Sequence, residues 1–160
     1  MELKKESMQI LKEKSRAKSQ ITFDEDFNVP DAKPDAGRLI QNKGRIIMDD
    51  VRLTDGKGIL TGNLQVDILY VGEERGIVSS LTAKLPFEET LNLKDIINGD
   101  KMCLKWEIED LTIRLIHSRK LNIKALVTFC ATVDETEQIR LPVALDAEEV
   151  SVRKKTVRFL

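Results

Sequence analysis

Few residues of this chain have the chemistry that catalysis requires. The 160 residues include a single histidine, His117, so a pair of imidazoles is excluded and a triad would depend on this residue alone. The carboxylate pairs Asp49-Asp50 and Glu88-Glu89 are adjacent in sequence, so on a strand they point to opposite faces and otherwise lie in a turn. Serine-hydrolase, phosphate-loop, zincin and Cys-x-x-Cys motifs are missing from the sequence. We therefore expect a protein that is not an enzyme, with no catalytic residues and no cofactor.

Metal binding has little support in the sequence. Asp31 and Asp35 lie in PDAKPDAG, residues 30–37, where each proline fixes φ and each aspartate can accept a turn or capping hydrogen bond. A divalent cation between them is the alternative, but two carboxylates without further oxygen ligands make a poor calcium loop. Cys103 and Cys130 are too few for a disulfide framework and have no metal-type spacing, so we expect two reduced thiols in strands.

Composition narrows the class of protein further. The chain has 26 basic and 27 acidic residues, a net charge of −1, and 4% aromatic residues. This balance lacks the electrostatic footprint of a nucleic-acid binder or a polybasic membrane anchor. The polar N-terminus resembles neither a signal peptide nor a membrane span, so we expect synthesis in the cytosol and no membrane insertion.

Alternation of apolar and polar residues predicts a β protein. In LNIKALVTFCATV, residues 121–133, every odd residue is apolar, which predicts a long strand with one buried face. Residues 59–71 show the same alternation, and Asp55-Gly56 before them predicts a hairpin turn. About eight short strands separated by turn residues favour an antiparallel sandwich or barrel.

Several local features interrupt this pattern. Pro86 is expected to end ladder pairing, and Gly62 to mark a bulge or a close approach. The apolar parity changes between residues 102–108 and 111–115, which predicts a bend, bulge or reversal at Glu109-Asp110. Trp106 and Tyr70 share parity with core residues, so we expect both to be buried.

The two ends of the chain are expected to differ from this β domain. Residues 2–15 are good helix formers with a thin apolar stripe of Leu3, Met8 and Leu11, which predicts a short helix that docks on the sheet, contacts another chain or frays. Residues 36–41 are expected to form one helical turn capped by Asp35. The predicted division is a helical lead-in at 1–19, a β domain at 20–143, and a last strand or the start of a further domain at 144–160.

Four segments resemble a known family in order and spacing. They are PDAKPDAGRLI, GILTGNLQVDILYV, LPFEETLNL and IHSRKLNIKALV. Together they are similar to the SPOCS (spore coat) domain of endospore-forming Firmicutes, over about Phe27 to Val133. The lead-in resembles the start of clostridial coat-morphogenesis proteins that interact with the spore-coat ATPase SpoIVA.

The resemblance implies a structural or adaptor domain of the spore coat or exosporium. Such a protein would be made in the mother cell and reach the forespore surface, with SpoIVA or copies of itself as partners. The candidate contacts are the N-terminal residues Leu3, Met8 and Leu11, the loop residues Asp31, Lys33 and Asp35, and the pair Arg119 and Lys120. The last pair could equally pack locally, with Arg119 bonding backbone carbonyls.

Two other functions stay open at this stage. A glycan-binding or peptidoglycan-binding sandwich would need exposed aromatic side chains. A lipocalin-like barrel would need an internal cavity.

Overall fold

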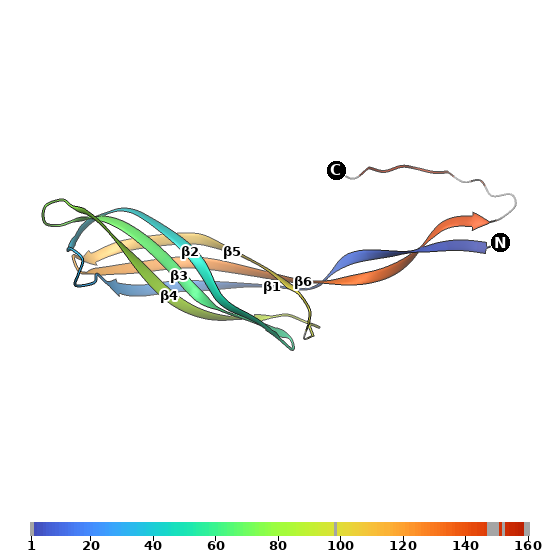
Figure 1. Ribbon diagram of the computed structural model, residues 1–160, viewed down its shortest axis with the longest axis horizontal. Helices are drawn as coiled ribbons and strands as arrows, with labels where there is room; N and C mark the ends of the chain where they lie inside the picture. Colours follow the sequence, from blue (N-terminus) through green and yellow to red (C-terminus); the bar gives the residue numbers. More distant parts are fainter. Residues whose placement is uncertain (1, 98, 147–150, 152, 159–160) are drawn as a thin grey trace. The chain divides into compact units, whose positions relative to one another are not determined.

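The structure is a computed structural model that describes residues 2–97, 99–146, 151 and 153–158. The described residues form six strands and contain no helix (Figure 1). The strands are β1 Glu2–Asn28, β2 Ala36–Thr54, β3 Lys57–Gly72, β4 Val78–Asn92, β5 Met102–His117 and β6 Lys120–Asp146. The chain divides into two units, residues 13–134 and residues 1–12 with 135–160.

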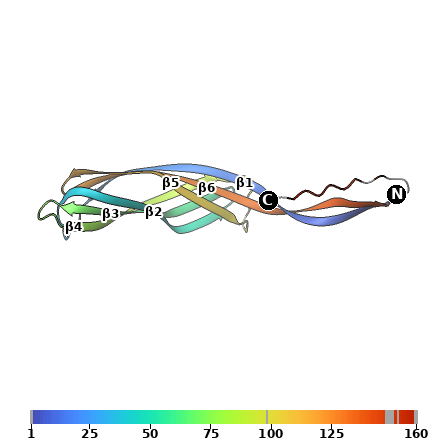
Figure 2. The ribbon, with the colours of Figure 1, turned by 90° about the horizontal axis from the view of Figure 1, so that it is seen from above.

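Residues 13–134 form a sandwich of two three-stranded sheets, so the predicted antiparallel β class is correct. One sheet has the order β1-β6-β5 and the other β2-β3-β4, and Figure 2 shows them as two layers. The pairs β2-β3, β3-β4 and β5-β6 are antiparallel. Side-chain bonds join Gln20 to Thr128 and Asp24 to Lys124. Strand β1 is therefore antiparallel to the part of β6 that it pairs with.

The core lies between the two sheets and follows the alternation of the sequence. On β6 the odd residues from Leu121 to Val133 are 0–3% exposed, and they face the even residues of β3. Three rings fill the side near β1 and β4, with Phe87 contacting both Phe23 and Phe129 at centroid distances of 6.1 and 5.3 Å. Tyr70 is fully buried, as predicted.

The predicted N-terminal helix is wrong, because Glu2–Asn28 is one strand. Residues 2–12 of β1 and 135–146 of β6 form a two-stranded ribbon, tied by an ion pair between Lys12 Nζ and Glu137 Oε2 at 3.5 Å. Helix propensity in this segment is worth only tenths of a kcal/mol per residue, so ladder bonds to a distant strand override it. The helical turn predicted at 36–41 is wrong for the same reason, since β2 begins at Ala36 and pairs with β3.

The interruptions predicted within strands have mixed outcomes. The parity change in β5 is a bulge, because the register shifts between Ile108 and Asp110 and leaves Glu109 as the extra residue. Gly62 lies at a close approach, where a Cβ would collide with the backbone oxygen of Ile47. Pro86 does not end the ladder. It pairs with Asn63 in the edge strand β4, where a residue without an N–H is tolerated.

The last strand of the described residues, β6, ends at Asp146. The sequence left a last strand open for residues 150–160, but Ser151 and residues 153–158 lie outside any strand. The remaining residues of that segment lie outside the described part of the chain. Among the described residues, no helix is long and apolar enough to cross a membrane.

Candidate functional site

Three connecting segments meet at one end of the sandwich unit. They are the loop at residues 29–35, the turn at 73–76 and the turn at 117–120. Backbone bonds of 2.8 Å join Val29 N–H to the carbonyl of Arg119, Ala36 N–H to that of Ser118, and Glu73 N–H to that of Asp35. These bonds hold the 29–35 loop in place although it has no ladder of its own.

Arg119 makes most of the side-chain contacts to this loop. Its Nη1 donates to the Lys33 carbonyl and to Asp35 Oδ1, both at 2.9 Å. Its Nη2 donates to the Val29 carbonyl at 3.1 Å and to Asp31 Oδ1 at 3.2 Å. A planar guanidinium can bond four acceptors in one plane, which an ammonium group cannot do. We call Arg119 with these four acceptors the Arg119 clamp.

The buried Tyr70 and the turn residue His117 make further hydrogen bonds that hold this loop and the turn next to it. Tyr70 Oη donates to the Pro34 carbonyl at 2.9 Å, so the buried ring has its polar end at the loop. His117 Nδ1 accepts a 3.2 Å bond from the Arg119 N–H, which shapes the turn that carries the guanidinium. The loop is therefore bonded to residues on three different segments.

Lys120 belongs to a row of charges across β1 and β6. Its Nζ is 2.9 Å from Asp26 Oδ2, and Lys124 Nζ is 3.0 Å from Asp24 Oδ2. Between them, Asn122 Nδ2 donates to both aspartates at 3.0 Å. The hydrogen bond from Asn122 is the main cause that lowers the pKa of Asp24 and of Asp26. The second cause is the hydrogen bond from the paired lysine, Lys124 for Asp24 and Lys120 for Asp26. This row joins the edge strand β1 to β6 on the outer face of the sheet.

The structure divides the eight predicted contact residues into two groups. Asp31, Lys33, Asp35 and Arg119 converge in the clamp, and Lys120 lies one residue further along β6. Leu3, Met8 and Leu11 lie on the ribbon strand and are 47%, 52% and 73% exposed. In the clamp, Asp31 is fully exposed at its side chain, and Lys33 is half-buried.

Asp31 and Asp35, the pair considered for a cation, both bind the guanidinium of Arg119. The described residues contain no group of three or more His, Cys, Asp or Glu side chains placed to hold a metal ion. Cys103 is exposed and Cys130 half-buried, and both thiols are free. The Sγ of Cys130 lies 4.0 Å from Arg16 Nη1.

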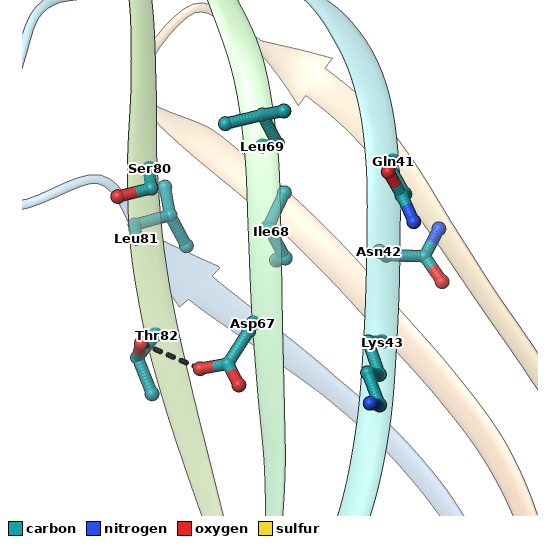
Figure 3. Close-up of a pocket in the computed structure, with 9 residues that line it drawn as sticks. All are labelled: Gln41, Asn42, Lys43, Asp67, Ile68, Leu69, Ser80, Leu81 and Thr82. Atoms are coloured by element: carbon teal, nitrogen blue, oxygen red, sulfur yellow. Dashed lines mark hydrogen bonds between the residues drawn. The ribbon is translucent and has the colours of Figure 1, made fainter.

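A shallow depression on the outer face of β2, β3 and β4 was missed by the sequence reasoning (Figure 3). It has a volume of about 330 Å³, and Asp67 projects into it beside Thr82. Thr82 Oγ1 donates to Asp67 at 2.8 Å, and this bond, with Gln65 and Arg45, lowers the pKa of Asp67. The polar parity of residues 61–67 was the signal available in the sequence. These groups can bond a polar ligand.

The prediction that Trp106 is buried is wrong, since it is 44% exposed. Trp106 pairs with the buried Phe129 of β6, so its side chain is on the face that points toward the core. However, β5 is an edge strand, and the other sheet covers the inward side chains of β5 only in part. Trp106 lines a depression of about 450 Å³ with Arg16, Lys18, Lys105, Glu107, Glu109, Thr128 and Cys130. Lys105 and Glu107 point to the opposite face of β5 from the Trp106 side chain, and the exposure of this tryptophan is a feature that the sequence alone did not indicate.

The fold and these surfaces define an all-β sandwich domain with open sheet edges and, at one end, a loop bonded to Arg119. Residues 35–116 match the family model of the SipL SPOCS domain, and the chain belongs to this family. Comparison with curated proteins and with solved structures gave no match. The matched residues end where the segment IHSRKLNIKALV begins, so they include Asp35 but not Arg119. Family membership indicates a sporulation-related protein-interaction domain.

Proposed function

We propose that this chain is a structural or adaptor domain in assembly of the spore coat or exosporium, and that it acts by protein contacts and not by catalysis. The observation that carries the proposal is the Arg119 clamp in a SPOCS domain, because it holds a surface loop rigidly. Loops fixed on a rigid sheet scaffold commonly carry binding residues. A pre-ordered loop also costs less conformational entropy on binding than a mobile one.

The proposed partner is a coat morphogenetic protein such as SpoIVA, or further copies of the chain. The proposed location follows from the partner: the mother-cell cytoplasm first, and then the forespore surface. Asp31 and Lys33 place one charge of each sign on the loop. A nearly neutral chain with a net charge of −1 also has little self-repulsion to oppose assembly.

Binding of the full chain to purified SpoIVA tests this proposal. The test variant is Asp31→Lys with Lys33→Glu, which exchanges the two loop charges and leaves the net charge unchanged. The matched control is Glu88→Lys with Lys84→Glu, the same exchange on exposed residues of β4. We expect the loop variant to weaken binding at least tenfold while the control binds like the original chain. Equal binding by both variants would exclude the loop as the contact, and no binding by the original chain would overturn SpoIVA as partner.

The exposure of Trp106 supports a second candidate, a module that binds glycan or peptidoglycan of the spore envelope. Sugar rings stack on exposed aromatic side chains, and the side chain of Trp106 is 44% exposed. Trp106 is the single tryptophan, so its fluorescence reports on this site alone. Titration with soluble peptidoglycan fragments should change the emission if this candidate is correct. An unchanged spectrum favours the adaptor function.

A further inference from the structure

Strand β4 lies at the edge of its sheet and pairs regularly with β3 over its whole length (Figure 1). The ladder runs from Asn92 opposite Lys57 to Val78 opposite Val71 without a register shift. The edge strands β2 and β5 are different, because register shifts interrupt both of their ladders. Such irregularities are one of the devices that keep sheet edges from pairing with other chains. Since β4 lacks this device along its ladder, its edge is well shaped to accept a further strand.

The exposed side chains of β4 are complementary to those of a second β4 strand. Two copies of β4 that lie antiparallel about a two-fold axis at Pro86 would place Lys84 opposite Glu88 of the second copy. The same axis would place Thr82 opposite the second copy's Thr90. Opposite charges and paired threonines both stabilise neighbouring strands. Lys84 and Glu88 are exposed, and neither forms an ion pair within the described part of the chain, so both are available to a second strand.

Pro86 occupies the centre of this self-complementary stretch. In an edge strand, the nitrogen of a proline faces away from the neighbouring strand, because a nitrogen toward that strand would leave a gap in the ladder. Backbone groups of an antiparallel strand face alternate sides with a period of two residues. The N–H groups of Lys84 and Glu88 therefore face outward, on the same side as the nitrogen of Pro86.

This placement makes Pro86 a defect in any pair of β4 edges. The outward N–H groups on both sides of it would find acceptors on the second strand, whereas Pro86 has no N–H to donate. Its ring would also lie where the second strand has to approach. Because the two-fold axis passes through Pro86, the defect occurs twice, at the middle of the contact.

We propose that Pro86 is a blocking residue, which keeps β4 from pairing with β4 of a second copy of this chain to form one continuous sheet. A second copy is the chain that this edge fits, because Lys84 and Glu88 flank Pro86 at equal spacing and with opposite charges. The strand β4 carries no residue of the Arg119 clamp, so this inference does not rest on the proposed function.

Sedimentation velocity of the full chain over a wide concentration series tests the inference. Pro86→Thr restores the missing N–H and adds a residue of high strand propensity, without a charge or a large apolar side chain. We expect this variant to dimerise with an association constant at least about 30-fold above that of the original chain, because two N–H···O bonds return to each dimer. Pro86→Ala restores the same N–H and should also dimerise, which excludes the threonine side chain as the cause. If neither variant associates more strongly than the original chain, the proposal is wrong.

Charge variants test the register of this dimer. Addition of Glu88→Lys to Pro86→Thr brings lysine against lysine on both sides of the axis and should weaken the dimer about tenfold or more. Further addition of Lys84→Glu restores opposite charges across the axis and the original net charge, and it should restore the dimer. If Glu88→Lys has no effect, or if the charge exchange fails to restore the dimer, the strands do not meet about residue 86 and the proposal is overturned.

Amide hydrogen exchange shows which edge forms the contact. In the Pro86→Thr dimer, exchange within residues 82–90 should slow relative to the original chain, while residues 29–35 should exchange as before. A dimer without slower exchange at 82–90 would have its contact elsewhere and would contradict the proposal. Slower exchange at 82–90 in a dimer of the original chain would also contradict it, because the edge would then pair in spite of Pro86.

Discussion

The Arg119 clamp gives the sharpest prediction for stability. Arg119→Ala removes all four side-chain bonds to the 29–35 loop and leaves the carbonyls of Val29 and Lys33 without this donor. We expect the free energy of unfolding to fall by about 2–4 kcal/mol. Arg119→Lys keeps the charge but can reach fewer of the acceptors, so we expect a smaller loss, about 1–2 kcal/mol.

The magnitude follows from the exposure of each acceptor. The two carbonyl bonds are partly buried, and each contributes about 1–1.5 kcal/mol. Asp35 has a side chain that is 49% exposed, so solvent screening limits its ion pair to less than about 1 kcal/mol. Asp31 is fully exposed and is counted as nothing. Asp31→Asn is therefore the matched control, with an expected change within about 0.5 kcal/mol.

Urea unfolding, followed by circular dichroism, measures these differences. Amide hydrogen exchange in residues 29–36 measures the loop directly, and it should rise in Arg119→Ala before global unfolding. If Arg119→Ala unfolds at the same urea concentration as Asp31→Asn, the guanidinium does not hold the loop. The clamp would then be a surface contact without energetic consequence.

Two further predictions concern packing and pH. Gly62→Ala should destabilise the sandwich by about 1–3 kcal/mol, because the new Cβ meets the backbone of Ile47. The control is Gly58→Ala, where the nearest atom to the new Cβ is the sulfur of the flexible Met102 side chain, at 3.3 Å. In the same urea experiment, Gly58→Ala should lower the free energy of unfolding clearly less than Gly62→Ala. Asp24 and Asp26 have lowered pKa values in the folded state, so their contribution is present above the ordinary value of 3.8 and is lost as the pH falls through the folded values. Asp24→Asn with Asp26→Asn should flatten the fall of melting temperature with acid, and an unchanged acid slope would show that the charge row contributes nothing.

Local sequence patterns predicted the sandwich because they record which face of each strand is covered. The alternation at 59–71 and 121–133 identified the two central strands, whose buried residues are now 0–3% exposed on β6. The parity change in β5 predicted a bend, bulge or reversal at Glu109-Asp110, and the structure has a bulge there that keeps both halves of the strand facing the core. These features are decided by neighbours within one strand or hairpin.

Features decided by distant partners were predicted poorly. Residues 2–15 were expected to be helical, because the strand that pairs with residues 2–12, residues 135–146, lies more than 120 residues away in sequence. Pro86 was expected to end a strand because its edge position depends on the order of the sheet. The four acceptors of Arg119 lie 84–90 residues before it, and the sequence left local bonding and partner contact as equal alternatives.

Trp106 and the exposed apolar residues Leu141, Val143 and Leu145 of β6 show a limit of the alternation itself. Parity states which residues share a face, but it does not state what covers that face. On β5, Trp106 has core parity and is exposed because the strand lies at an edge. On β6, Glu135 and Glu137 interrupt the pattern, and apolar odd residues return from Ile139 to Leu145, outside the sandwich unit. Parity therefore predicts that Leu141, Val143 and Leu145 share one face of β6, whereas the cover of that face depends on elements that are distant in sequence.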